Sequence, residues 1–259
     1  MMNRSRIFQS LSAVAIVAIA TAAAQAAFIG IDDFEDYTAA DSISDKDDWN
    51  NNGTVATDPA GGSNLVLAFD PSNGTGYYNG SDIAIADGST ATLFFRARMT
   101  AGGQAFGFGM SDTTSPNPWD SFEAQLTWDK TGNPISVRNG GKDGPHPAAA
   151  ATADAWYNIW MVIDNDNDTY DVHFQSNDDA TYSSKTKVGD DAGFRNDPAE
   201  NDLESFFMRT NDGTGSVLYI DDIYLDTAGE NLANPIPEPG TLALLGIGGL
   251  GVLLRRRQG

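Results

Sequence analysis

Apolar and polar residues alternate in short runs through the middle of the chain. In Leu93–Met99 the odd positions are apolar, whereas Arg96 and Arg98 share the other face. In Tyr170–Gln175 the even positions are apolar and His173 lies on the opposite face. Because successive side chains of a β-strand point to opposite faces, a period of two predicts strands with one buried and one solvated face.

Similar runs recur along the chain, separated by clusters of Gly, Asn, Asp and Pro that are typical of turns. No window has the pattern of a long amphipathic helix. Two antiparallel sheets packed face to face would bury such strands. We therefore expect an all-β fold, an antiparallel two-sheet β-sandwich of the jelly-roll type. The predicted strands cover residues 64–69, 90–100, 104–110, 121–128, 155–164, 169–175, 205–210 and 216–226.

The N-terminal residues 1–27 have the pattern of a secretory signal peptide. Arg4 and Arg6 precede an uncharged, Ala-rich segment from Leu11 to Ala24, and Ala24-Gln25-Ala26 supplies a cleavage site. The apolar segment is shorter than the roughly 20 residues that a membrane-spanning helix needs. Cleavage is therefore favoured over a permanent N-terminal anchor, and the rest of the chain is expected outside the cytoplasm.

The C-terminal residues 234–259 contain a second targeting pattern. A Pro-rich linker is followed by an apolar segment at 241–254 and then by a basic cluster. Fourteen helical residues span about 21 Å, less than the roughly 30 Å hydrocarbon core. The basic residues are expected to stay on the cytoplasmic side of the membrane. Because the segment is short, we expect it to enter the membrane as a helix only transiently. The residues that define the pattern are Pro237, Glu238, Pro239, Arg255, Arg256 and Arg257.

This order of Pro-Glu-Pro, apolar segment and terminal Arg cluster resembles the PEP-CTERM sorting domain. The resemblance implies export through the inner membrane and processing by an exosortase located there. The chain would be membrane-anchored before processing and would then reside at the cell surface or in the extracellular matrix. The family occurs on exported proteins of Gram-negative bacteria that make extracellular polysaccharide, which makes such a polysaccharide a candidate partner.

The cargo between these two ends, residues 28–233, is strongly acidic. The ends hold five of the 15 basic residues and one of the 36 acids, so the cargo has 10 basic and 35 acidic residues, a net charge of −25. This charge excludes nucleic acid as a partner, because phosphate binding depends on clustered Lys and Arg. With no Cys and two His, a disulfide scaffold, a thiol nucleophile and a multi-histidine metal centre are also excluded.

The cargo also resembles laminin-G-like and concanavalin-A-like domains. Trp156–Asp164, a polar turn and Thr169–Val172 look like a hairpin of those folds, and Asp32–Glu35 and Tyr219–Leu225 look like their opening and closing strands. In similar sandwiches the terminal strands bring acids together around a structural Ca²⁺. By that resemblance the candidate metal ligands are Asp33, Glu35 and Asp222. The alternative is that these acids face solvent beside a strand end and serve hydration.

Carbohydrate binding is the first functional hypothesis for the cargo. A sugar site combines an accessible aromatic ring, which packs against the C–H face of the sugar, with polar side chains that bind its hydroxyls. Four aromatic residues in loop-like sequence are candidate ligand contacts: Trp49, Tyr77, Tyr78 and Trp119. For each of them, packing in the core is the alternative role. Three further tryptophans, Trp128, Trp156 and Trp160, lie in predicted strands and are expected in the core.

Catalysis is not expected. Hydrolysis of a glycosidic bond normally needs two carboxylates at a defined separation, and the cargo contains five Glu but no Glu-x-Asp-x-Glu strand motif. The Gly-x-Ser-x-Gly nucleophile motif is absent as well. The sequence predicts a non-catalytic carbohydrate-binding or adhesion module. The alternatives are a structural protein of the exopolysaccharide matrix without a specific ligand and, third, a carbohydrate-active enzyme.

Overall fold

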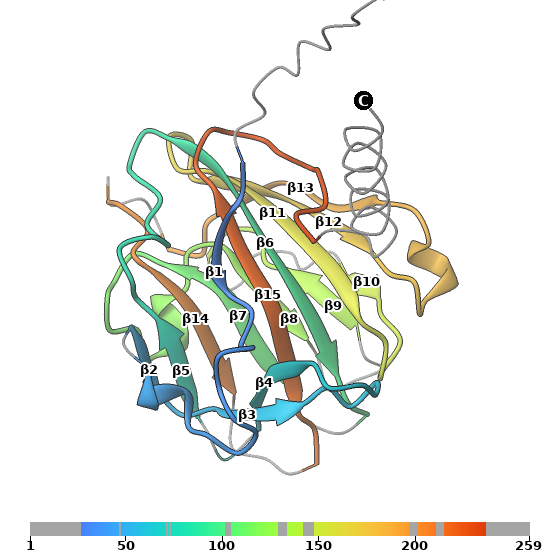
Figure 1. The fold of residues 1–259 in the computed structure, drawn as a ribbon. Coiled ribbons are helices and arrows are strands. Elements are labelled where there is room, and N and C mark those ends of the chain that lie inside the picture. Colours follow the sequence, from blue (N-terminus) through green and yellow to red (C-terminus); the bar gives the residue numbers. More distant parts are fainter. Residues whose placement is uncertain are drawn as a thin grey trace, which may run out of the picture.

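The computed structural model describes residues 27–236 apart from 47, 71, 73, 102–104, 129–133, 142–147, 197–200 and 211–214. Within them the chain forms two antiparallel sheets, and the strands of the larger sheet lie in front of those of the smaller one (Figure 1). Most of the two predicted targeting segments, 1–27 and 234–259, lies outside the described residues, which exclude 1–26 and 237–259. In the described part of the chain, no helix is long and apolar enough to cross a membrane.

Sheet A has eight strands in the order β13-β12-β11-β6-β15-β4-β3, and β1 pairs with β15. Its strands are β1 (Ile29–Asp32), β3 (Thr54–Thr57), β4 (Leu65–Phe69), β6 (Thr90–Met99), β11 (Tyr157–Asp164), β12 (Thr169–Gln175), β13 (Thr186–Gly193) and β15 (Leu218–Asp226).

Sheet B has seven strands in the order β10-β9-β8-β7-β14-β5-β2. Its strands are β2 (Trp49–Asn51), β5 (Thr75–Tyr78), β7 (Phe106–Ser111), β8 (Gln125–Trp128), β9 (Pro134–Val137), β10 (Ala148–Ala150) and β14 (Ser205–Thr210). Three short 3-10 helices are η1 (Ile43–Asp45), η2 (Trp119–Ser121) and η3 (Ala180–Tyr182). The predicted all-β, antiparallel two-sheet sandwich is confirmed.

Aromatic side chains from the inner faces of the two sheets form the core. Phe95 of β6 lies 5.8 Å from Phe108 of β7 and 5.4 Å from Phe206 of β14, measured between ring centroids. Trp128 of β8 packs against Tyr157 of β11 at 5.9 Å. The inward positions of the alternating runs are buried, as predicted. Burial of these large rings supplies much of the hydrophobic stabilisation of the sandwich.

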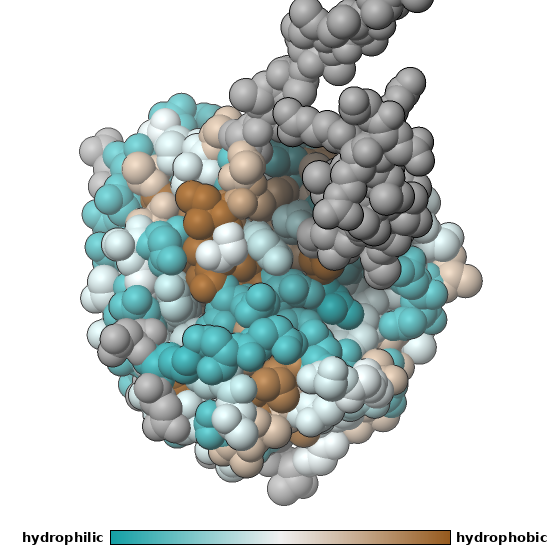
Figure 2. Space-filling view, viewed as in Figure 1, coloured by the Kyte–Doolittle hydropathy of each residue, from teal (hydrophilic) through white to brown (hydrophobic). Residues whose placement is uncertain are grey.

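The outer face of sheet A is not uniformly solvated. Phe94 of β6 and Trp160 of β11 point away from the main core, yet both are fully buried, with ring centroids 5.0 Å apart. Trp160 was expected in the core and instead belongs to this outer pair. A hydrophilic band crosses the same face of the molecule, with hydrophobic patches above and below it (Figure 2). The outer face therefore carries both a polar surface and a local aromatic pair.

Candidate functional site

An open pocket of about 490 Å³ lies where β1 and β15 of sheet A meet β2 and β5 of sheet B. We call it the β1 pocket. Its walls combine aromatic rings with carboxylates, a composition suited to a polar ligand that also has an apolar face. The lining residues are Gly30, Ile31, Asp32, Asp33, Asp36, Tyr37, Lys46, Trp49, Tyr78, Ile223 and Tyr224.

Asp32, the last residue of β1, organises the pocket. Its Oδ1 accepts a hydrogen bond from the backbone N–H of Phe34 at 2.7 Å, which supports a turn in which Phe34 has φ of 58°. The turn directs the Phe34 ring into the core, 5.7 Å from the ring of Trp49. The Trp49 indole Nε1–H donates to the other carboxylate oxygen, Oδ2 of Asp32, at 2.6 Å. Asp32 is therefore held in one orientation from both sides.

The electrostatics of the β1 pocket are acidic. Burial raises the pKa of Asp32, and the neighbouring charges of Asp36 and Asp33 raise it further, while the hydrogen bonds from Phe34 and Trp49 oppose the shift. Lys46 is the basic residue of the lining, and its Nζ pairs with Asp36 Oδ2 at 2.6 Å. Three carboxyl groups thus face one ammonium group, so the pocket disfavours an anionic ligand.

Trp49 and Tyr78 form a buried part of the pocket wall. Trp49 is 3% exposed and Tyr78 is 7% exposed, and their ring centroids lie 5.3 Å apart. The Tyr78 hydroxyl donates to Asp82 Oδ1 at 2.9 Å. Trp49 and Tyr78 lie in strands β2 and β5, so the prediction that they lie in loops is wrong. Rings accessible to a ligand must come from the rest of the lining, in which Tyr224 is half-buried.

The other two candidate aromatics lie elsewhere. Tyr77 follows the alternation of β5 to the opposite side from Tyr78 and packs with Phe122 and Phe207 in a separate cluster on the outer side of sheet B. Trp119 is half-buried in η2, 5.9 Å from the Phe122 ring. The predicted set therefore divides into two pairs, with one pair in the β1 pocket and one pair outside it.

The three predicted calcium ligands come from the expected places but do not form a compact site. Asp33 and Glu35 follow β1, and Asp222 lies at an irregularity of β15 with φ of 51°. Burial raises the pKa of Asp222, and the charges of Asp33 and Glu35 add to that shift. Glu35 Oε1, however, already accepts from the Leu65 N–H at 2.8 Å.

Arg96 on β6 provides the cation that pairs with Asp222. Its Nη1 lies 3.1 Å from Asp222 Oδ2 and 3.3 Å from Oδ2 of the adjacent Asp221. Burial and the charge of Asp222 raise the pKa of Asp221 to about 8. Ca²⁺ ligands lie 2.3–2.6 Å from the ion, so their oxygens must be within about 5 Å of one another. Asp33, Glu35 and Asp222 are not such a group in the described part of the chain, and the calcium site stays a prediction.

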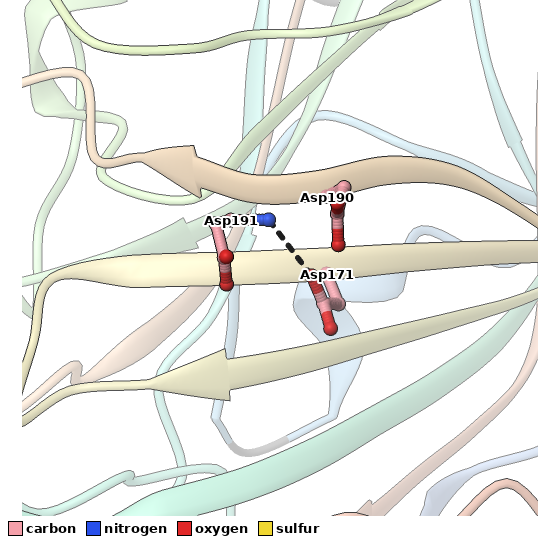
Figure 3. Close-up of side chains that lie close together, drawn as sticks. All are labelled: Asp171, Asp190 and Asp191. Atoms are coloured by element: carbon pink, nitrogen blue, oxygen red, sulfur yellow. Dashed lines mark hydrogen bonds between the residues drawn. The ribbon is translucent and has the colours of Figure 1, made fainter.

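Another set of three carboxylates lies close enough together to hold a metal ion. Asp171 of β12 and Asp190 and Asp191 of β13 each place a carboxylate oxygen within 4.8 Å of the others (Figure 3). The Asp191 N–H donates to Asp171 Oδ1 at 2.9 Å. Lys187 pairs with both Asp171 and Asp190, and these contacts raise the pKa of the lysine. A lysine thus already pairs with two of the three carboxylates. The sequence analysis did not single out this group from the many acidic turns.

Glu123, which precedes β8, is a buried acid of another kind. Burial raises its pKa to about 7, and the charges of Asp112 and Asp168 add to the shift, whereas hydrogen bonds from Asn196 oppose it. These three acids line a cavity of about 10 Å³. A cavity of that volume holds about one water molecule, so a sugar ring does not fit there.

Comparison with known proteins identifies the end of the chain and the fold. Residues 235–257 match the PEP-CTERM protein-sorting motif, as predicted. Its residues Pro237, Glu238, Pro239, Arg255, Arg256 and Arg257 lie outside the described residues. The chain shows no significant similarity to any curated protein sequence.

Solved structures with a similar fold include the catalytic domain of a glycoside hydrolase family 131 protein from Coprinopsis cinerea. The TM-score is 0.54 at 14% identity, covering 83% of this chain and 99% of that one. Peanut lectin matches at a TM-score of 0.49 and 10% identity, covering 76% and 95%. The carbohydrate-binding module CBM66 from Bacillus subtilis matches at 0.42 and 14%, covering 69% and 95%. At such identities only the fold is shared, since one fold supports many functions.

Proposed function

We propose that the protein is an exported, non-catalytic carbohydrate-binding or adhesion module of the cell surface or extracellular matrix, delivered by a PEP-CTERM and exosortase system. The sorting motif at 235–257 supports the route. The observation that supports binding is the β1 pocket, which has an open volume of about 490 Å³ and walls of tyrosine, tryptophan and aspartate. That volume lies within the range of about 300–1,000 Å³ typical of small-molecule sites.

The chemistry of the pocket favours a neutral or amine-bearing sugar. The half-buried ring of Tyr224 offers surface to the C–H face of a sugar, and the carboxylates of Asp33 and Asp36 are exposed acceptors for hydroxyl or ammonium groups. A uronic acid would bring a further negative charge into a pocket with three carboxyl groups, which is unfavourable. The proposed ligand is therefore a polysaccharide without a high density of carboxylates.

A binding role fits the pocket better than hydrolysis does. A glycosidase places two carboxyl groups on either side of the scissile bond. In the β1 pocket, both oxygens of Asp32 are occupied by Phe34 and Trp49, while Glu123, the acid with a pKa of about 7, faces a cavity too small for a sugar. Turnover of any polysaccharide by the purified protein would overturn this part of the proposal.

A glycan-array screen of the purified protein tests the proposal directly. We expect saturable binding to neutral or amino-sugar polymers and weaker binding to uronates. The double variant Asp33→Asn and Asp36→Asn should weaken it about tenfold or more, since a hydrogen bond to a charged group contributes about 1.5–3 kcal/mol. Asp166→Asn, an exposed substitution in the β11–β12 turn outside the pocket lining, is the matched control.

A blank array from a folded sample would favour the alternative, a structural matrix protein without a specific ligand. Binding that is unchanged in the Asp33→Asn and Asp36→Asn variant would place the ligand outside the β1 pocket. Trp49 is unsuitable for this test, because it is 3% exposed and packs against Phe34 and Tyr78. Replacing it would perturb folding together with binding.

A further inference from the structure

After β15 ends at Asp226, the chain folds back over sheet A. We call residues 227–236 the strap. Thr92 of β6 binds it twice, because its Oγ1 donates to the Gly229 carbonyl at 2.8 Å and accepts from the Asn231 N–H at 2.9 Å. The Asn231 side-chain amide donates to Asp226 Oδ2 at 2.7 Å. The start of the strap is therefore fixed to the outer face of the sheet.

The end of the strap is held by β11 and by the segment before β13. The Trp160 indole Nε1–H donates to the Ala233 carbonyl at 2.9 Å. Lys185 donates to the Leu232 carbonyl, and its Nζ lies 3.8 Å from the centroid of the Trp160 ring. The Pro-rich linker predicted from the sequence begins at residue 234. It therefore follows directly after Leu232 and Ala233, which are held on sheet A.

The other end of the cargo lies on the same face. The Phe28 ring is 6.3 Å from the ring of Phe94 in an edge-to-face arrangement, and Phe94 in turn contacts Trp160 at 5.0 Å. Phe28 begins the cargo, and Ala233 ends it. One aromatic pair on sheet A thus contacts both ends of the domain, and Figure 1 shows β1 and the C-terminal end of β15 adjacent at this face.

We propose that the outer face of sheet A is the membrane-facing side of the sorting precursor. Seven residues separate Ala233 from Thr241, where the predicted membrane segment begins. The eight residue-to-residue steps from Ala233 to Thr241 reach at most about 29 Å in any conformation. Before signal-peptide cleavage, the four steps from Ala24 to Phe28 reach at most about 14 Å. Both tethers leave from one face, so the bilayer lies opposite that face and sheet B points away.

This orientation follows from the strap and not from attraction to lipid. The hydrophilic band on this face and the net charge of −25 of the cargo oppose penetration of the bilayer (Figure 2). The docked strap and the short length of chain after it instead hold the cargo with one face toward the bilayer and at a limited distance. The inference rests on the sorting motif and is independent of whether the β1 pocket binds a glycan.

Energy transfer to a membrane dye tests the orientation. The chain has no cysteine, so single-cysteine variants of the full-length protein can be labelled cleanly. Gln175→Cys places the donor on the outer face of sheet A, and Ser136→Cys places it on the outer face of sheet B; both sites are half-buried and alternate with buried neighbours. In phosphatidylcholine vesicles with a rhodamine lipid, we expect about twofold more transfer from position 175, because packed sheets are about 10 Å apart.

Two further proteins test the role of the strap. Thr92→Val with Asn231→Ala removes the side-chain hydrogen bonds at the start of the strap, and a ten-residue Gly-Ser insertion after Ile236 lengthens the tether without touching the strap. We expect both changes to reduce the difference between positions 175 and 136, with Tm measured to verify folding. Equal transfer from the two faces, a reversed order, failure of the full chain to float with vesicles, or an unaltered difference in both proteins would overturn the inference.

Discussion

At the scale of single residues, Glu123 should make stability depend on pH. Its pKa is raised from 4.5 to about 7, chiefly by burial, so the folded state binds its proton more tightly than the unfolded state does. This contribution is fully present below pH 4.5 and is lost as pH rises through about 7. In the Glu123→Gln variant, the free energy of unfolding measured with urea should change less between these pH values than in the wild type. The two changes should differ by at most about 3 kcal/mol.

The comparison must be made between variants, because other groups titrate in the same range. Asp221 has a pKa raised to about 8, so it also loses its stabilising proton as pH rises. The measured quantity is therefore the difference between wild type and Glu123→Gln at pH 5 and pH 8. Glu204→Gln, a half-buried position immediately before β14 of sheet B, is the control. Parallel pH profiles for wild type and Glu123→Gln would show that Glu123 does not bind its proton preferentially in the folded state.

Arg96 should be the most important surface-facing residue for stability. Its guanidinium group pairs with the 1% exposed carboxylate of Asp221 and with Asp222, and it stacks 4.7 Å from the Trp156 ring centroid. Arg96→Met leaves the carboxyl groups of Asp221 and Asp222 without their cation. We therefore expect a loss of about 2–4 kcal/mol in the free energy of unfolding at a pH above the raised pKa of Asp221, where that group is ionised in the wild type.

The neighbouring Arg98 on the same face is the matched control for Arg96. It pairs with Asp154, whose side chain is 53% exposed, and exposed pairs contribute about 0–1 kcal/mol. Arg98→Met should therefore cost clearly less than Arg96→Met. Equal losses in the two variants would mean that packing of the aliphatic stem, not the charge of Arg96, accounts for its effect.

At the scale of elements, calcium would act by joining β1 to β15. The predicted ligands Asp33 and Glu35 follow β1, and Asp222 lies in β15. For a structural ion at this place, EDTA should lower Tm and Asp222→Asn should abolish the difference between calcium and EDTA. Asp190→Asn, at the unrelated carboxylate group of β13, should retain that difference. An identical Tm with calcium and with EDTA would exclude the ion.

The eight strands predicted from alternation all overlap observed strands; most of their boundaries agree to within two residues, and one start is wrong by four residues. The run at 121–128 is a strand only over Gln125–Trp128, because Trp119–Ser121 forms a 3-10 turn after Pro118 and the chain becomes extended later. Strands such as β13, Thr186–Gly193, could not be predicted in this way. β13 is polar and mostly exposed, so pairing with β12 defines it and a hydrophobic period does not.

The candidate site was predicted only in part, because strand pairing, which local sequence does not reveal, decides where its side chains lie. The aromatic character of the loop-like segments was informative, but the pairing of β2 with β5 buries Trp49 and Tyr78 and sends Tyr77 to the other side. The sequence analysis placed Asp32 in the opening strand but assigned it no role in a site. Its role depends on the indole of Trp49, 17 residues away, and no local pattern signals such a contact.

At the scale of the whole molecule, charge should govern which matrix components the cargo meets. The cargo carries a net charge of −25, which repels polyanionic polysaccharides over roughly 10 Å at 0.1 M salt. Neutral polymers are unaffected by this repulsion. For the proposed function, the acidic pocket and the acidic surface therefore favour the same class of ligand.

The matched sorting motif includes residues 235–257, and Glu238 is the charged residue of its Pro-Glu-Pro sequence. We expect Glu238→Gln, or deletion of 241–257, to leave unprocessed precursor in a host that has the exosortase, detected as a larger band in immunoblots of membrane fractions. Glu230→Gln, eight residues upstream in the strap and outside the matched region, is the control and should be processed normally. Normal processing of the Glu238→Gln and deletion variants would show that processing does not require this motif. A signal elsewhere in the chain would then direct the protein.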